Sequence, residues 1–444
     1  MMKRPFLVLP ALCIPLFGAD CPMDTSTPMG INNPGGNAND NSSAGASEGT
    51  SPDSDWEQVA RLAAFDAAVD DLFASAISAS DSVAVVGAPA KNSLTGLVDI
   101  FINIGGDWSY HSRVVGDTAR FPEQSFGASV AVSNTRLIVG APKYAIPGSF
   151  HIQRGALYVF ANRGQVFDQI QILTIPDGVD DEMLGAAMAY DVDQGHIIAG
   201  APGRNDRQGA AYVFRDTGGT FIQTQRLTAS DGGQFDDFGG SMAMTNVWAA
   251  IGAANKSSGL GAVYIYERMA SDYVEIQKIS APDGKSTDKF GAAIAMEDDL
   301  LVISAPSKQR EGDTLLMAGY VYIYRRVNGL YTLEATIIPD DAIAGLFGLD
   351  VAVHDDRIAI TAGGKGRVLL YEKSGDTWKM TVTLAPFESR AFDSFGTGIE
   401  FRDDFIMIGS PSADVESKRA AGAAYIFADP DANPGPGVTP GVRI

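Results

Sequence analysis

The sequence predicts an all-β fold, a seven-bladed β-propeller closed by its N-terminal strand. A unit of roughly 50 to 60 residues recurs seven times, which is the sequence signature of a repeat architecture. Within each unit, apolar and polar residues alternate with the period-2 pattern of strands. The last unit lacks its fourth strand, and a matching strand stands before the first unit. We therefore expect one closed ring of blades rather than several domains.

Each unit opens with a pair of landmarks that frame its first two strands. An aromatic residue or leucine, usually followed by glycine, comes first, at Phe73, Phe126, Leu184, Phe238, Phe290, Phe347 and Phe395. A Gly-Ala-Pro or related triplet follows, beginning at Gly87, Gly140, Gly200, Gly252, Ser304, Thr361 and Gly409. Glycine permits a close approach of inner strands, and proline is tolerated where a strand ends. Both landmarks are therefore interpreted as structural.

The third and fourth strands of each unit are marked by aromatic residues. Alternating segments such as 156–160 and 262–266 are typical third strands. Another aromatic stands seven residues beyond the last aromatic of the third strand, and an aliphatic residue follows six positions later on the same strand face. Trp108 with Val114 is one such pair. The pattern predicts a fourth strand in six of the units.

The seventh unit finds its fourth strand at the other end of the chain. Position 434 is proline, so no fourth strand follows Tyr425-Ile426-Phe427. Trp56 and Leu62 repeat the aromatic-plus-six pattern just before the first unit. Pairing of this N-terminal strand with the last blade would remove open sheet edges.

This combination of landmarks resembles the FG-GAP repeat, the unit that builds the propeller of integrin alpha subunits and of many bacterial exported proteins. The resemblance covers the range 56–429. It implies a seven-bladed propeller that acts as a binding or adhesion module.

The resemblance also implies calcium in the loop between the first and second strands, where integrin-type propellers carry an Asp-x-Asp-x-Asp-Gly series. Most of these loops are too short here. The third unit, with Asp191 and Asp193 before Gly195, comes nearest to the series. Calcium takes about six to eight oxygen ligands, and this loop offers two carboxylates. Ordinary turn chemistry is the favoured interpretation, calcium at Asp191 and Asp193 is the alternative, and no other cofactor is expected.

Acidic residues gather in the loops that lead from the fourth strand of one unit to the first strand of the next. In a propeller these loops share one face with the connections between the second and third strands. The candidate ligand-binding residues on this face are Asp180, Asp181, Glu182, Asp236 and Asp237. The competing interpretation is repeated turn and cap chemistry. The connections 143–154 and 307–318 are long, and loops on a rigid scaffold are common binding elements.

The net charge of -21 opposes binding to phosphate backbones, so nucleic acid is excluded as a partner. The four histidines, His111, His151, His196 and His354, lie in different units and form no metal or nucleophile motif. A catalytic site is therefore not expected. We expect a monomeric, non-enzymatic module that binds an extracellular protein or glycan. The alternatives are a polysaccharide hydrolase or lyase on a propeller scaffold and a structural envelope component.

The start of the chain predicts export. Lys3 and Arg4 precede an apolar stretch, which is typical of a signal peptide over 1–20. Cys21 has the position of a lipidated cysteine, although Asp20 departs from that pattern, so lipid anchoring and ordinary cleavage after Ala19 both remain open. A membrane tether is expected only if Cys21 is lipidated. Segments 21–55 and 430–444 have the composition of a disordered linker and tail.

Overall fold

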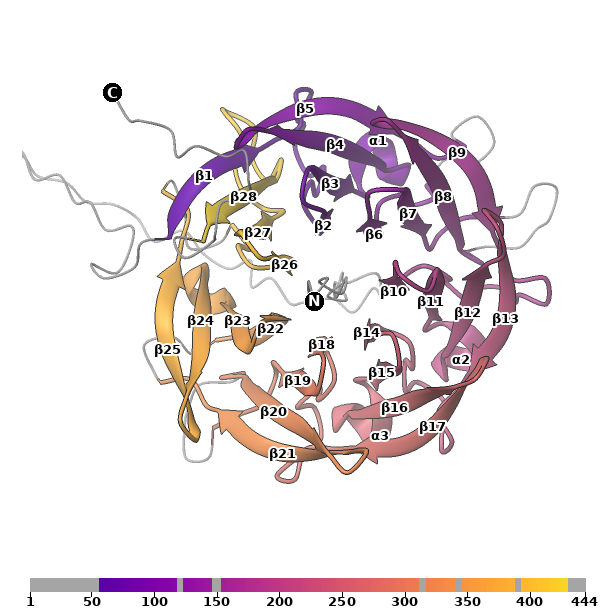
Figure 1. Ribbon diagram of the computed structural model, residues 1–444, viewed down its shortest axis with the longest axis vertical. Coiled ribbons are helices and arrows are strands. Elements are labelled where there is room, and N and C mark those ends of the chain that lie inside the picture. The colour runs from indigo at the N-terminus through magenta and orange to yellow at the C-terminus, as the bar shows by residue number, and fades with distance from the viewer. Residues whose placement is uncertain are drawn as a thin grey trace, which may run out of the picture.

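The computed structural model describes residues 56–117, 123–145, 153–310, 317–340, 345–387 and 393–429. Within them the chain forms seven four-stranded antiparallel sheets arranged around a central axis (Figure 1). The predicted all-β, seven-bladed propeller is confirmed. The predicted signal peptide, linker and tail, with Cys21, lie outside the described residues, and so do parts of the long connections 143–154 and 307–318. These domain assignments stay predictions.

The first four blades follow one another along the chain, each from its innermost to its outermost strand. Blade one contains β2 (Ala76–Ala79), β3 (Val83–Ala88), β4 (Leu97–Ile104) and β5 (Asp107–Val114). Blade two contains β6 (Ser129–Val132), β7 (Arg136–Ala141), β8 (Ala156–Arg163) and β9 (Val166–Leu173). Blade three contains β10 (Met188–Asp191), β11 (His196–Ala201), β12 (Ala210–Asp216) and β13 (Phe221–Leu227). Blade four contains β14 (Ser241–Met244), β15 (Trp248–Ala253), β16 (Ala262–Met269) and β17 (Asp272–Ile279).

The last three blades complete the ring. Blade five contains β18 (Ile294–Glu297), β19 (Leu300–Ala305), β20 (Tyr320–Val327) and β21 (Leu330–Ile337). Blade six contains β22 (Phe347–His354), β23 (Arg357–Ala362), β24 (Arg367–Ser374) and β25 (Thr377–Leu384). Blade seven combines β26 (Ile399–Phe401), β27 (Phe405–Ser410) and β28 (Ala423–Ala428) with β1 (Glu57–Leu62).

The predicted closure by the N-terminal strand is confirmed. Strand β1 pairs antiparallel with β28, and Leu62 lies opposite Ala424. The ring of Trp56 is buried and meets Phe401 in a T-shaped arrangement at a centroid distance of 6.2 Å. The first and last segments of the ring therefore share one sheet and one apolar cluster.

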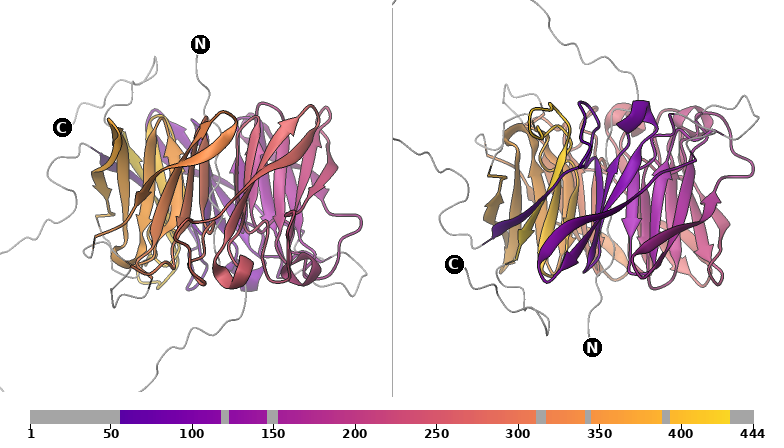
Figure 2. Two further views of the ribbon diagram at one scale, coloured as in Figure 1. Left: turned by 90° about the horizontal axis from the view of Figure 1, so that it is seen from below. Right: turned by 90° about the horizontal axis from the view of Figure 1, so that it is seen from above.

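Short turns connect the second and third strands in four blades. Helical turns α1 (Lys91–Leu94), α2 (Arg204–Arg207) and α3 (Lys256–Gly259) serve blades one, three and four, and the 3-10 turn η1 (Gly363–Lys365) serves blade six. The side views show α1 and α3 on the same face of the ring (Figure 2). We call this face, which also carries the connections from outer to inner strands, the connection face. The opposite face carries the short hairpins between first and second strands, and we call it the hairpin face.

The two sequence landmarks meet at the contacts between neighbouring blades. A Cβ placed on Gly87, the first residue of a Gly-Ala-Pro triplet, would lie 2.1 Å from the carbonyl oxygen of Gly127 in the next blade. Gly127, which follows the landmark Phe126, has φ of +91°. A side chain at either position would push the inner strands apart. The structural interpretation of both motifs follows directly from this contact.

Glutamine side chains join the outer strands of three pairs of neighbouring blades. The amide of Gln225 on β13 donates to the carbonyl oxygen of Tyr273 on β17 at 2.8 Å and accepts from its N–H at 2.8 Å. The same two bonds link Gln171 to Phe221 and Gln277 to Tyr331. Each glutamine stands four residues after the outer-strand aromatic of its own blade. We call these contacts glutamine clasps.

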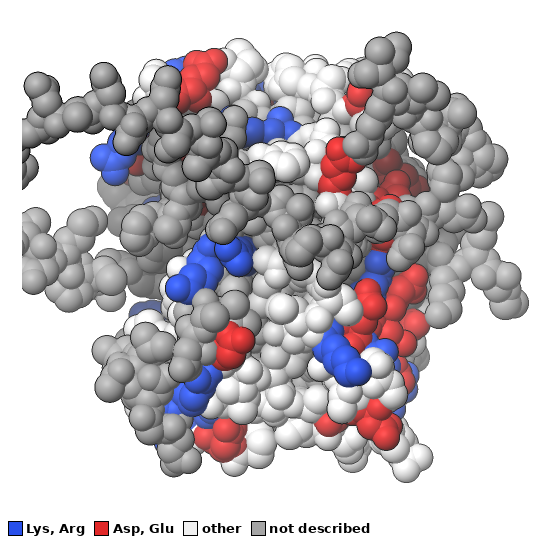
Figure 3. Space-filling model, turned by 90° about the vertical axis from the view of Figure 1, so that its left-hand side faces the viewer, with Lys and Arg blue, Asp and Glu red and all other residues white. Residues whose placement is uncertain are grey.

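On the outer side that carries β1 and β25, several acidic side chains gather towards one edge, with basic side chains among them (Figure 3). No helix within the described residues is long and apolar enough to cross a membrane.

Candidate functional site

A ring of residues with left-handed backbone marks the connection face. The residue directly before each landmark aromatic or leucine has φ between 51° and 63°, although none of them is glycine: Leu72, Ser125, Met183, Asp237, Lys289, Leu346 and Ser394. This conformation costs a non-glycine residue roughly 1–2 kcal/mol. Backbone bonds from the second-to-third connections hold it in place, as where the N–H of Asp237 donates to the carbonyl oxygen of Arg207 at 2.8 Å.

Four members of this ring line a pocket at the inner end of blades three to six. Met183, Asp237, Lys289 and Leu346 each contribute to its wall. The pocket has a volume of about 280 Å³. Small or aliphatic residues form most of the rest of the lining: Ala186, Pro202, Gly240, Ser241, Ala254, Gly291, Ala292, Pro306, Ser307 and Leu349. None of the described residues that line it is aromatic. The wall is thus mainly aliphatic, with charged groups at a few positions.

The charged groups of the pocket form a chain across three blades. Arg207 binds Asp237 with two hydrogen bonds, Nε to Oδ1 at 2.7 Å and Nη2 to Oδ2 at 2.5 Å. The side-chain amide of Asn255 contacts the same carboxylate through its nitrogen and the Nζ atom of Lys289 through its oxygen. Arg207 itself has φ of 62°, at the end of the left-handed turn in α2. Leu94 in α1 has the same backbone, with φ of 68°, so this turn belongs to the repeat.

The five predicted ligand-binding residues separate into two groups. Glu182 and Asp236 are buried and lie in ion pairs within their own blades, and their role in ligand binding stays a prediction. Asp180 and Asp181 are exposed, and Asp180 lies 3.5 Å from the Nε atom of Arg154. Of the five, Asp237 lines the pocket.

Many acidic side chains on the connection face form ion pairs with basic side chains of their own blade. In blade four the Nζ atom of Lys256 lies 2.9 Å from Asp236 and also contacts Asp231, while the hydroxyl of Tyr264 donates to Asp231 at 2.5 Å. Burial would raise the pKa of Asp231, but hydrogen bonds from Lys278, Tyr264 and Lys256 hold it well below the usual range. Burial and the bond to Asp231 raise the pKa of Tyr264. Blades one, three and five repeat the arrangement with Lys91, Arg204 and Lys308. The predicted acidic rim is therefore largely a set of structural ion pairs.

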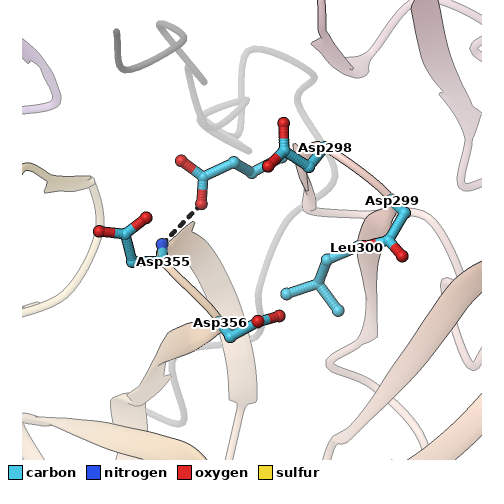
Figure 4. A pocket seen from close by; sticks show the side chains of 6 residues that line it. Asp298, Asp299, Leu300, Asp355 and Asp356 are labelled. Atoms are coloured by element: carbon cyan, nitrogen blue, oxygen red, sulfur yellow. Dashed lines mark hydrogen bonds between the residues drawn. The ribbon is translucent and has the colours of Figure 1, made fainter. Parts of the chain in front are cut away.

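The hairpin face carries an acidic recess of about 300 Å³ between blades five and six (Figure 4). Glu297, Asp298 and Asp299 line it from the β18–β19 hairpin, and Asp355 and Asp356 from the β22–β23 hairpin. The N–H of Asp355 donates to Glu297 at 2.7 Å. No group of three or more potential metal-binding side chains is gathered in the described part of the chain.

Basic residues neutralise much of the negative charge of this recess. Arg325 bridges the two hairpins, with Nη1 at 2.8 Å from Asp299 and 3.0 Å from Asp356. The ring of His354 lies between Glu297, at 3.2 Å from Nδ1, and Asp403, at 2.7 Å from Nε2. Burial lowers the pKa of His354, yet the bond to Glu297 and the nearby carboxylates raise it overall. The recess is thus a link between blades as much as an open anionic surface.

The loop predicted as the alternative calcium site has turn geometry. Oδ1 of Asp191 accepts the N–H groups of Asp193 and Gln194 at 3.0 and 3.1 Å. Ser133 and Thr245 occupy the equivalent position in blades two and four and accept hairpin N–H groups in the same way. Asp193 is exposed. These contacts agree with the turn interpretation; calcium binding itself stays a prediction.

Sequence reasoning missed Arg207, Asn255 and Lys289. Two of them, Lys289 and Asn255, stand beside landmark motifs in the sequence. Lys289 stands directly before the landmark Phe290, and Asn255 follows a Gly-Ala-Ala triplet. Without knowledge of the left-handed backbone, neither position stands out from ordinary loop residues.

Comparisons with known proteins support the repeat assignment. The model of the FG-GAP repeat matches residues 56–97, 221–266 and 273–324. Integrin alpha-2 of Mus musculus is 30% identical over 171 residues, which cover 36% of this chain and 14% of the integrin. The chain thus corresponds to a small part of that relative. The WD40 domain of Toxoplasma gondii coronin is similar in structure, with a TM-score of 0.50, 9% identity and coverage of 84% of this chain and 87% of the coronin domain. This likeness concerns the fold alone. By its repeats and its integrin alpha-like homology, the chain is an FG-GAP repeat protein whose fold is a seven-bladed propeller.

Proposed function

We propose that this protein is an exported, non-catalytic binding module that presents its connection face to an extracellular protein. The observation that carries the proposal is the mainly aliphatic pocket at the inner ends of blades three to six, which Arg207, Asp237 and Lys289 also line. A concave apolar site with a few convergent polar groups is the usual form of a binding site. The kinship with a repeat found in an integrin alpha subunit supports a role in binding.

The lining of the pocket favours a protein over a glycan. Protein interfaces gain most of their affinity where apolar side chains fill well-packed pockets. Here the wall is built from Met183, Leu346, Leu349 and small residues. Aromatic rings, on which sugars could pack, are missing from the described residues that line it.

The same pocket argues against glycoside hydrolysis. That reaction uses two carboxyl groups, one as acid and one as base or nucleophile. Asp237 is the one carboxylate among the described lining residues, and it is bound by Arg207 at 2.7 Å and 2.5 Å. We therefore assign a binding role rather than a catalytic one.

The proposal is tested by probing arrays of extracellular proteins and of glycans with the full-length chain, with and without calcium. Protein hits are then retested with Ala292→Leu, which fills the pocket. Leu349 occupies the equivalent position in blade six, so the fold accommodates leucine there. The matched control is Asp298→Asn on the hairpin face, where φ of 50° suits asparagine.

We expect protein hits whose binding weakens about tenfold or more with Ala292→Leu, since a blocked pocket removes a main anchor. Asp298→Asn should leave binding unchanged. Glycan hits alone, or protein hits that respond to Asp298→Asn and not to Ala292→Leu, would refute the proposal.

A further inference from the structure

The charges in the pocket do not balance. Arg207 is matched by Asp237, with two bonds of 2.7 and 2.5 Å. Lys289 contacts the neutral amide oxygen of Asn255, and no carboxylate of the described residues forms an ion pair with it. One positive charge is therefore left in the lining of the pocket, on a chain whose net charge is -21.

Lys289 differs in this respect from the other cations that point inward on the connection face. Lys91, Arg204, Lys256 and Lys308 each lie within 2.9 Å of a buried carboxylate of the same blade. Those four cations are therefore paired within their own blades and stabilise the fold. Lys289 is half-buried, lines the pocket and keeps its charge available to a bound group.

The rest of the lining from blades five and six is mainly aliphatic. Leu346 and Leu349 of blade six and Pro306 of blade five extend the lining beyond Lys289. Leu346 is 39% exposed, so part of its apolar side chain is open to a bound group. The volume of about 280 Å³ is just below the range of small-molecule pockets, roughly 300–1,000 Å³, and suits one or two side chains.

We infer that the pocket binds a segment of a partner protein in which an aliphatic side chain stands next to a carboxylate, and that Lys289 selects for the carboxylate. This inference rests on the proposed function and adds the chemistry of the partner. The aliphatic group packs against the leucines, and the carboxylate of Asp, Glu or a chain end meets Nζ of Lys289. Burial of the aliphatic group supplies affinity, while the ion pair supplies specificity and orientation.

Three small probes of nearly equal shape separate the contribution of charge from that of apolar contact. They are 4-methylpentanoate, its neutral amide and 4-methylpentylamine, titrated into the full-length chain and followed by NMR. We expect the acid to bind about three- to fivefold more tightly than the amide, as is typical of one partly exposed ion pair. The amine should bind more weakly than either. Equal binding of acid and amide, or preference for the amine, would overturn the inference.

Variants of Lys289 test whether this residue causes the preference for the acid over the amide. Lys289→Gln should make acid and amide equal, and Lys289→Glu should invert the order in favour of the amine. Lys379→Gln, on the exposed outer strand β25, is the matched control and should keep the preference for the acid. Persistence of the preference in Lys289→Gln would refute the assignment. Far-UV circular dichroism confirms that each variant is folded.

Two further outcomes separate the inference from the proposed function. A protein partner that is weakened by Ala292→Leu but not by Lys289→Gln leaves the proposed function intact and refutes the inference. Acid preference that depends on Lys289, without any protein partner sensitive to Ala292→Leu, refutes the proposed function. Decanoate tests a lipid as the occupant, because binding about a hundredfold tighter than that of 4-methylpentanoate would show that the site holds a long chain and not a side chain.

Discussion

The Nζ atom of Lys256 lies 2.9 Å from the Oδ2 atom of Asp236, and both side chains are less than a tenth exposed. The two residues stand 20 positions apart, before and after the first two strands of blade four. The pair thus links the segment before β14, which contains Asp236, to the turn after β15, which begins with Lys256. Equivalent pairs in blades one and five have the same separation of 20 residues.

Because Lys256 and Asp236 form a buried ion pair, removing one of them should lower the stability of the fold strongly. Lys256→Met should lower the free energy of unfolding by about 3–5 kcal/mol, because Asp236 is left buried without its cation. The double variant Lys256→Met with Asp236→Leu should be less damaging than the single one. Urea unfolding gives these values. Lys278→Met removes an exposed partner of Asp231 and serves as the control, with an expected loss below about 1 kcal/mol.

The glutamine clasps predict that some seams between blades are stronger than others. Gln225→Ala removes two hydrogen bonds of 2.8 Å between blades three and four and should cost about 1–3 kcal/mol. Gln223→Ala, at an exposed position on the same strand, should change stability by less than about 0.5 kcal/mol. Thermal unfolding of the two variants compares them directly. Equal stability would show that the clasps contribute nothing.

Closure predicts that the N-terminal strand is indispensable. Deleting residues through Leu62 removes β1, exposes the edge of β28 and uncovers the cluster around Trp56. The truncated chain should melt well below the full one and aggregate through the exposed edge. Deletion of residues 22–50 is the control and should leave the melting temperature unchanged. A truncation as stable as the parent would contradict the role of β1.

A buried carboxyl group predicts how stability depends on pH. Glu400 is 2% exposed, and Oε2 has no hydrogen-bond partner among the described residues. Burial raises the pKa of Glu400 to about 8, against a usual value of 4.5, although Arg402 partly opposes the shift. Between these two values the folded chain holds a proton that the unfolded chain has lost. Stability contributed by this group therefore falls as pH rises through that window.

Glu400→Gln isolates the effect, because glutamine is uncharged at every pH. Relative to the parent, the variant should gain stability steadily from pH 5 to pH 8, as measured by urea unfolding at each pH. Parallel profiles of parent and variant would show that Glu400 does not titrate in this range.

Most of the architecture could be predicted from the sequence, because each blade repeats its landmarks. The aromatic-plus-six pattern at Trp56 and Leu62 was sufficient to locate the closing strand, since alternation on a strand depends only on local spacing. The contact of Gly87 with Gly127 explains why both motifs recur.

The site could be predicted only in part. The acidic loops were identified correctly as part of the connection face, yet Glu182 and Asp236 are buried beside Arg204 and Lys256. Those cations stand 22 and 20 residues further along the chain, so the pairing depends on how the strands fold back. The left-handed backbone at Lys289 likewise arises from contacts with a neighbouring connection, and residue type alone does not reveal it.

The most direct test of the central claim is hydrogen–deuterium exchange of the full-length chain with and without a protein partner from the array. We predict slower exchange in segments 183–187, 237–241, 289–292 and 345–349, which surround the pocket on the connection face. Segments 192–195, 297–300 and 354–357 of the hairpin face should exchange as in the free chain. Protection confined to the hairpin segments would contradict the account, because the partner would then bind the opposite face.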